Sequence, residues 1–316
     1  MVIPAASRPS SDSAPPVWVV RHQRPVSISM AKSIEEGFRL LRSNLEITNL
    51  QATAAATRQA SVRRALEDDF EIHESFLTGS YQRNTMIGPL KEADIDIFFV
   101  LDSKYYGADG QASLLAAIKR ALRKTYTQTP DISPDGQAVT ITFTDFKVDV
   151  VPGFYRQGGG YLIPDSERGR WIQTDPKKHV ELWSAANKAH TQNLVPLLKM
   201  VKGWNKSRNL LRSFHLECLV LSVLEGVEIT NFPSGLRYVF DKARAKIEYK
   251  LADPAGYSDD VAAYLTDAKQ MQTIIERLTW AYERAQEAER HAVAGESQKA
   301  FAKWDLILKG YFPAYG

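Results

Sequence analysis

The sequence predicts an α+β fold in which a small mixed sheet forms one lobe and helices form a second lobe. Hydrophobic residues make up 44% of the 316 residues, which is enough for a sizeable core. Short β-branched and aromatic runs gather in the first half of the chain, whereas helical patterns dominate from Asp175 onward. A change of this kind along the chain favours two lobes with a ligand-binding cleft between them.

The first elements are a tail and a helix. Residues 1–29 are rich in proline and serine and predict a flexible tail. Ser33 and Glu36 form a capping-box pattern. The apolar stripe that follows continues to Leu66 and predicts one long helix at the start of the first lobe. We therefore expect a tail over 1–29, a core over 30–165 that begins with this helix, and a helical lobe over 166–316.

The sheet elements follow in order. Residues 76–80 indicate a short strand that enters a glycine turn, and the β-branched and aromatic run Asp94–Leu101 indicates a buried strand. Leu114, Leu115, Ile118 and Leu122 mark an amphipathic helix. Residues 138–143 and 146–151 predict a hairpin whose second strand ends at Pro152-Gly153. The strongest helical patterns in the second lobe cover residues 194–204, 214–224, 261–294 and 298–308.

Composition excludes several classes of protein. The 40 basic and 37 acidic residues give a net charge of +3, too small for a protein that coats long nucleic acid. A single cysteine, Cys218, excludes an internal disulfide and a cysteine-built zinc site. No stretch reaches the roughly 18 apolar residues that a membrane helix needs. We expect a cytoplasmic protein without membrane partners.

Three aspartates are the strongest candidates for chemistry. Asp94 and Asp96 stand two apart on a predicted strand, so both side chains project from one face of the sheet. Asp149 lies on a later strand that brings a third carboxylate to this surface if the strands are neighbours. Three such acids repel one another unless cations neutralise them, and Mg²⁺ prefers carboxylate oxygens. The pattern predicts a site for two Mg²⁺ ions, with Mn²⁺ as an alternative. Taken alone, Asp94 and Asp96 also fit a solvated sheet face.

Gly79-Ser80 adds a candidate phosphate site about fifteen residues before these aspartates. Glycine lets the backbone approach a phosphate closely, and the serine hydroxyl is a further donor. A Gly-Ser pair alone marks only a turn, so its weight comes from its position before Asp94 and Asp96.

Together these motifs resemble the polymerase β-like nucleotidyltransferases, and more narrowly the bacterial CD-NTases related to cyclic GMP–AMP synthase and oligoadenylate synthase. The resemblance runs from about residue 30 to the C-terminus, so residues 30–165 would be the nucleotidyltransferase core. It rests on Gly79–Thr85, Asp94–Ile97, Val148–Pro152, Asp175–His179, Lys202–Asn205, Ser213–Glu217 and the segment from Trp304 to Pro313.

The resemblance implies an activity and roles for residues. Such enzymes join nucleoside triphosphates into a cyclic di- or trinucleotide and release pyrophosphate, and the product activates an effector in anti-phage (CBASS) defence. Asp94, Asp96 and Asp149 would be catalytic and would hold the metals, and Gly79 and Ser80 would bind the triphosphate. Lys202 and Ser213 match a lysine and a serine that contact the triphosphate from the helical lobe.

Other assignments compete with these. Lys199, one turn before Lys202, could take over the lysine role, and Ser213 could instead cap the helix that follows it. Trp171, Tyr161 and Asp165 are candidates for the base pocket, although the two aromatic residues also fit a core. His179 and His215 lack metal-ligand spacing, so His215 is interpreted as a hydrogen-bonded, partly buried histidine.

Two further alternatives concern acceptor and partners. The same fold could make a linear 2′–5′ oligoadenylate or transfer a nucleotide to an RNA, a protein or a small-molecule hydroxyl, and a catalytically silent regulator would also bind nucleotides. The final Gly316 could be joined to a target by an associated ligase, as the C-terminus of some relatives is.

Overall fold

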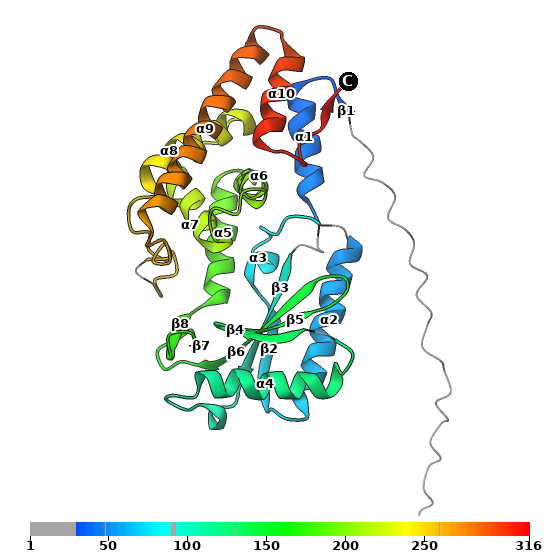
Figure 1. Ribbon diagram of the computed structural model, residues 1–316, viewed down its shortest axis with the longest axis vertical. Coiled ribbons are helices and arrows are strands. Elements are labelled where there is room, and N and C mark those ends of the chain that lie inside the picture. The colour runs from blue at the N-terminus through cyan, green and yellow to red at the C-terminus, as the bar shows by residue number, and fades with distance from the viewer. Residues whose placement is uncertain (1–29, 48, 90–92, 130, 259) are drawn as a thin grey trace, which may run out of the picture.

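The computed structural model describes residues 30–316 apart from 48, 90–92, 130 and 259, so the predicted tail over 1–29 lies outside the described residues. The sheet, with helices α2 (Asn49–Glu67) and α4 (Gln111–Thr125), lies at one end of the molecule. Most of the other helices lie at the opposite end (Figure 1). This arrangement confirms the α+β fold with a mixed sheet and a helical region.

The sheet has seven strands in the order β2-β3-β6-β5-β4, and a β7–β8 hairpin pairs with the end of β6. β3 and β6 are parallel, whereas the other pairs are antiparallel, so the sheet is mixed as expected. The strands are β2 (Ile72–Leu77), β3 (Asp94–Leu101), β4 (Ile132–Asp135), β5 (Ala138–Thr142), β6 (Lys147–Tyr155), β7 (Tyr161–Asp165) and β8 (Arg170–Thr174).

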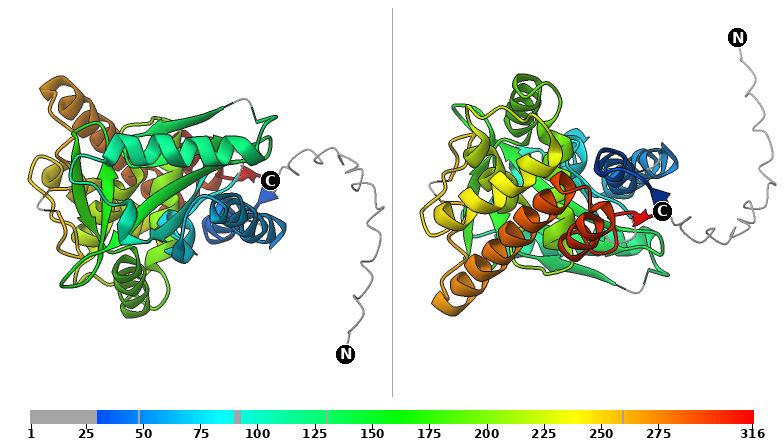
Figure 2. Two further views of the ribbon diagram at one scale, coloured as in Figure 1. Left: turned by 90° about the horizontal axis from the view of Figure 1, so that it is seen from below. Right: turned by 90° about the horizontal axis from the view of Figure 1, so that it is seen from above.

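Alternation along β3 separates its two faces. Ile95, Ile97 and Phe99 belong to a buried cluster that includes Leu66 of α2 and Ile118 of α4. These two helices therefore cover one face of the sheet, and Figure 2 shows α4 running across it. The intervening side chains of β3, Asp94 and Asp96 among them, project from the opposite face.

The helical end forms a separate hydrophobic cluster. It contains the three fully buried tryptophans Trp183, Trp204 and Trp304, and it includes apolar residues of the N-terminal helix α1 (Ile34–Leu45). The remaining helices are α3 (Gly79–Gln82), α5 (Pro176–Ala189), α6 (Leu194–Lys206), α7 (Ser213–Leu224), α8 (Phe232–Lys246), α9 (Ala268–Val293) and α10 (Ser297–Ile307).

The expected single helix over the first residues is two helices. Its start is as predicted, because Ser33 Oγ accepts a hydrogen bond from Glu36 N at 3.2 Å and Glu36 Oε2 accepts one from Lys32 N at 2.9 Å. Helix α1 ends at Leu45, and α2 begins at Asn49. The break lets α1 pack in the helical cluster and α2 pack on the sheet, as Figure 1 shows.

Two other predicted boundaries are wrong. Strand β6 does not end at Pro152-Gly153 but continues to Tyr155. Pro152 lies beyond the last residue that pairs with β5, so it interrupts no pairing on that side, while it still stands opposite Phe99 of β3. Helix α9 begins at Ala268 instead of Val261, because the Asp267 side chain accepts a hydrogen bond from Lys269 N and caps it there.

The last strand closes the chain onto its first described residues. β9 (Ala314–Tyr315) pairs in parallel with β1 (Met30–Ala31), and Gly316 N donates to Ala31 O at 3.2 Å. Within the described part of the chain, no helix is both long and apolar enough to cross a bilayer.

Candidate active site

The three predicted aspartates lie on adjacent strands of one sheet face. β3 carries Asp94 and Asp96, β6 carries Asp149, and Asp96 stands directly opposite Asp149 in the parallel pairing. Thr140 of β5 follows on the same face, where its hydroxyl donates to Asp149 Oδ1 at 2.6 Å. The strand register alone therefore places the three carboxylates on one face of neighbouring strands.

The electrostatics of this surface fit a cation site. Burial, followed by the charges of Asp149 and Asp94, raises the pKa of Asp96 to about 7, although Arg83 and Lys202 oppose the shift. A divalent cation bound here would stabilise the charged form of this carboxyl group and offset the repulsion from the two other acids. The donor set consists of carboxylate oxygens, which suits Mg²⁺ or Mn²⁺.

Gly79 forms the turn next to this surface. Its φ of +62° is a left-handed conformation that favours glycine, and a Cβ built there would overlap the Asp96 carboxylate. Thr78 N also donates to Asp96 O at 2.9 Å. Ser80 O accepts hydrogen bonds from Thr85 N and Met86 N, which close the chain around the turn. The predicted strand that enters a glycine turn at residues 76–80 is confirmed, although the strand begins earlier, at Ile72.

A cleft with a volume of about 1220 Å³ opens over this surface. From the sheet end it is lined by Gly79, Ser80, Asp94, Asp96 and Asp149. The helical end contributes Lys202, Ser213 and Phe214, and the β7–β8 hairpin contributes Asp165, Arg168 and Arg170. The structure thus brings all seven predicted site residues to one cleft.

Lys202 and Ser213 share a partner that the sequence analysis gave no role. The buried carboxylate of Glu217 accepts hydrogen bonds from Lys202 Nζ at 3.0 Å, from Ser213 Oγ at 3.4 Å and from Arg83 Nε at 2.9 Å. Ser213 does not cap α7, because Arg212 is the N-cap residue and no side-chain cap hydrogen bond forms. The spacing of Ser213 and Glu217, one helical turn apart, is the only sequence signal for this contact.

The other candidates occupy different places. Lys199, the alternative to Lys202, is buried, donates to Glu46 Oε2 at 2.5 Å and does not line the cleft. Trp171 Nε1 donates to Gly107 O at 2.9 Å, and Tyr161 packs on Phe98 with ring centroids 5.0 Å apart. Neither of these aromatic residues lines the cleft, so their structural interpretation holds.

Asp165 lines the cleft as the prediction for a base contact requires. Its buried carboxylate accepts a hydrogen bond from Arg168 N at 3.1 Å and lies 3.8 Å from Arg170 Nε. The carboxylate is therefore already bound to its own hairpin.

The two histidines are held by hydrogen bonds. His179 Nε2 lies 2.8 Å from Asp253 Oδ1, and His215 Nδ1 lies 3.1 Å from the Tyr264 hydroxyl. Burial lowers the pKa of His215 to about 4, so this ring is neutral near pH 7.

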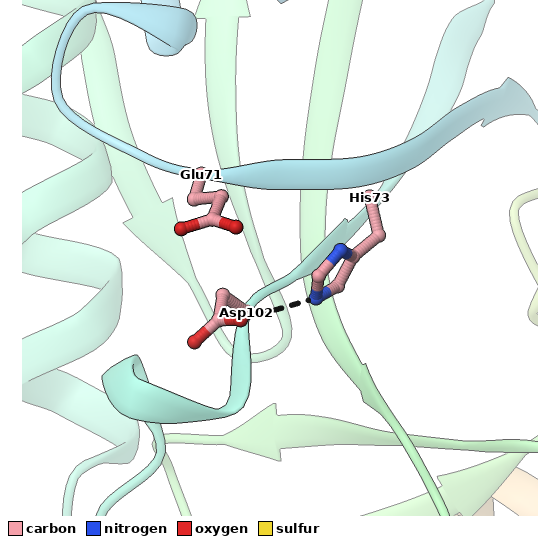
Figure 3. A group of neighbouring side chains, drawn as sticks. All are labelled: Glu71, His73 and Asp102. Atoms are coloured by element: carbon pink, nitrogen blue, oxygen red, sulfur yellow. Dashed lines mark ion pairs between the residues drawn. The ribbon is translucent and has the colours of Figure 1, made fainter.

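A second group of ligand-type side chains lies at the other end of β3. Glu71, His73 and Asp102 have ligand atoms within 4.8 Å of one another, and His73 Nε2 lies 3.3 Å from Asp102 Oδ2 (Figure 3). No other group of three within this distance occurs among the described residues, so the three sheet aspartates are more widely spread. Lys104 Nζ lies 2.7 Å from Glu71 Oε2 and already neutralises that carboxylate.

Comparisons with known proteins identify the family of this chain. Residues 32–187 match the Second Messenger Oligonucleotide or Dinucleotide Synthetase (SMODS) domain. A cyclic AMP-AMP-AMP synthase from an Acinetobacter species is 28% identical over 289 residues, which cover 83% of this chain and 81% of that protein.

Solved structures share the fold. CdnC from Escherichia coli MS115-1 with ATP has a TM-score of 0.71 at 19% identity and covers 89% of this chain and 99% of its own. Its complex with a HORMA protein has a TM-score of 0.70 at 18% identity, with 89% of this chain and 98% of that chain covered. The Vibrio cholerae cyclic AMP-GMP synthase DncV has a TM-score of 0.61 at 14% identity, with 88% of this chain and 86% of that chain covered.

The fold, the SMODS match and the curated relative all point to one family. This chain belongs to the bacterial CD-NTases, the nucleotidyltransferases that synthesise cyclic oligonucleotide or dinucleotide second messengers.

Proposed function

We propose that the cleft joins nucleoside triphosphates, ATP among them, into a cyclic di- or trinucleotide that serves anti-phage signalling, with release of pyrophosphate. The observation that carries this proposal is the position of Asp94, Asp96 and Asp149 on one sheet face. The face lies beside the Gly79-Ser80 turn, and the buried cations Lys202 and Arg83 line the same cleft.

In this proposal Asp94, Asp96 and Asp149 hold two divalent ions. Bound Mg²⁺ would supply Lewis-acid stabilisation to the attacking and the leaving oxygen. Gly79 lets the backbone approach the triphosphate without a side chain in the way. Ser80 supplies a hydroxyl donor, and Ser213 would exchange its hydrogen bond to Glu217 for one to the triphosphate. Lys202 supplies positive charge from the opposite side of the cleft. Positioning and charge neutralisation therefore account for most of the expected catalysis.

ATP is the first substrate to test. The similar Acinetobacter enzyme is named for a product of three AMP units, and a solved CdnC structure contains ATP. We expect product from ATP alone or from ATP with one other nucleotide.

Product identity tests this proposal. The purified protein is incubated with Mg²⁺ and four nucleoside triphosphates, each omitted in turn, and phosphatase-treated products are analysed by mass spectrometry. The proposal predicts one phosphatase-resistant species whose mass lacks one water relative to the linear oligonucleotide with a single 5′-phosphate. A ladder of linear oligomers would contradict it, and a product that survives omission of ATP would contradict the choice of substrate.

We also propose three kinds of partner. A HORMA protein binds the structurally similar CdnC, so a protein of that kind is a candidate activator. An effector would bind the product. A ligase acting on Gly316 would meet an exposed residue whose amide bonds to Ala31.

A further inference from the structure

A fully buried carboxylate stands behind the helical wall of the cleft. Glu217 has no exposed surface and does not line the cleft, yet it contacts three residues that do. Its Oε1 accepts from Lys202 Nζ at 3.0 Å and from Ser213 Oγ at 3.4 Å, and its Oε2 accepts from Arg83 Nε at 2.9 Å. A buried carboxylate with this many donors is held firmly in one position.

The contacts of Glu217 join separate parts of the fold. Lys202 comes from α6, and Ser213 and Glu217 come from α7. Arg83 follows α3 at the sheet end, and its backbone N donates to Gly79 O at 3.2 Å. Through Arg83, Glu217 is therefore connected to the turn beside Asp96, although the two regions are 134 residues apart in the chain.

Aromatic packing leaves the Arg83 guanidinium little freedom. It lies 5.3 Å from the ring centroid of Trp183 and 5.3 Å from that of Phe214. Its side chain is 8% exposed, and that of Lys202 is 10% exposed. Two cations with so little contact with water require a negative partner, and Glu217 provides it.

Charge in this cluster is balanced by Glu217. Burial raises the pKa of Glu217, but Lys202 and Arg83 outweigh that effect and lower it to about 2. Burial lowers the pKa of Lys202, and Glu217 opposes this shift, whereas Arg83 adds to it. Without Glu217, Lys202 would face Arg83 without a hydrogen-bonded counter-charge, and its ammonium group would lose the contact that fixes its place.

We propose that Glu217 is a positioning residue for triphosphate binding, which holds Lys202 at the cleft and ties it through Arg83 to the Gly79-Ser80 turn. This inference rests on the proposed function, because it assigns to Lys202 the contact with the triphosphate. Glu217 itself is expected to touch no substrate atom.

Glu217→Gln is the direct test, because it keeps the size and one acceptor of the side chain and removes the charge. We expect the KM for ATP and the Kd for ATP to rise about tenfold or more. The matched control is Glu46→Gln, which removes the carboxylate bound to Lys199, a buried lysine one turn earlier on the same helix. Its KM for ATP should stay at the wild-type value even where its unfolding temperature falls.

A double-mutant cycle separates positioning from general damage. If Glu217 acts through Lys202, the change in ATP affinity caused by Glu217→Gln should disappear in a Lys202→Met background. Glu217→Asp keeps the charge and should recover part of the affinity. Full additivity with Lys202→Met, wild-type affinity in Glu217→Gln, or tighter ATP binding in that variant would each overturn the inference.

Failure of the proposed function gives a different result. In that case the wild-type protein neither binds ATP nor forms product, whatever residue stands at position 217. An active wild type with an unchanged KM in Glu217→Gln overturns the positioning role alone.

Discussion

At the scale of single residues, Gly79 packs against Asp96 with no room for a side chain between them. The Asp96 carboxylate occupies the space that a side chain at position 79 would need, and the φ of Gly79 is +62°. Two separate requirements, backbone conformation and space, therefore act on one glycine.

Gly79→Ala should violate both requirements, with one effect on stability and another on activity. We expect the left-handed φ to cost about 1–2 kcal/mol of the free energy of unfolding. Displacement of Asp96 should lower kcat by about 100-fold or more. Denaturant unfolding and product formation measure the two effects.

Gly226→Ala is the matched control for backbone strain. Gly226 has a φ of +69°, and nothing lies within 4 Å of a Cβ built there. Its variant should lose similar stability with unchanged kcat. Equal kcat in both variants would contradict the claim that a side chain at position 79 displaces Asp96.

The lowered pKa of His215 predicts how the free energy of unfolding depends on pH. Its folded pKa of about 4 lies below the ordinary value of 6.5 for histidine, so between these values the unfolded chain binds more protons. Stability from this residue is present above pH 6.5 and is lost as the pH falls towards 4. The expected loss between pH 7 and pH 5 is about 2 kcal/mol.

Unfolding of the wild type and of His215→Gln at several pH values measures this loss. The variant should be less sensitive to pH in this range. Parallel curves for the two proteins would show that His215 makes no such contribution.

Residue spacing predicted one part of the site better than the other. Asp94 and Asp96 share a face because strand side chains alternate, and this needs no knowledge of the partner strands. Lys199 and Lys202 could not be separated in this way. Both are on α6, and what distinguishes them is the carboxylate each meets: Glu46 is 153 residues from Lys199, whereas Glu217 is 15 residues from Lys202.

At the scale of elements, boundaries followed local patterns except where tertiary packing decided them. Apolar periodicity predicted α4, and Leu115, Ile118 and Leu122 are buried in it. The same periodicity ran from Ser33 to Leu66 and gave no sign of the break between α1 and α2. That break depends on two different cores, which no short stretch of sequence reveals.

The ion pair between Lys199 of α6 and Glu46 at the end of α1 predicts that loss of one partner lowers the free energy of unfolding more than loss of the other. Lys199 is 2% exposed, whereas Glu46 is 42% exposed. Loss of Glu46 leaves a buried ammonium group without its carboxylate, while loss of Lys199 leaves a carboxylate that water can solvate. We expect Glu46→Gln to lower the free energy of unfolding by about 2 kcal/mol and Lys199→Met by at most about 1 kcal/mol.

Urea unfolding of the two single variants, compared with the wild type, measures this difference. Asn84 Oδ1 also accepts from Lys199 at 3.4 Å, so Asn84→Ala in the Glu46→Gln background should add a further loss. Equal costs for the two single variants would contradict the assignment of the buried charge to Lys199.

At the scale of the whole molecule, two hydrophobic clusters enclose one polar cleft. One cluster unites the sheet with α2 and α4, and the other unites α1 with the helices of the second half. The strand patterns in the first half of the chain and the helical patterns from Asp175 onward predicted two lobes with a cleft between them. The walls of the cleft depend on how the two ends meet, so Arg83 and Glu217 received no role from the sequence alone.

The central claim is that Asp94, Asp96 and Asp149 form the metal-dependent centre of a cyclic nucleotide synthase. The most direct measurement compares the wild type with the Asp94→Asn, Asp96→Asn double variant, using labelled ATP together with the other three nucleoside triphosphates, Mg²⁺ and phosphatase treatment. We expect a phosphatase-resistant product from the wild type and none from the double variant. Mg²⁺ should raise the unfolding temperature of the wild type only, because Asn removes both the repulsion and the metal ligands. Product formation by the double variant at the wild-type rate would contradict the account.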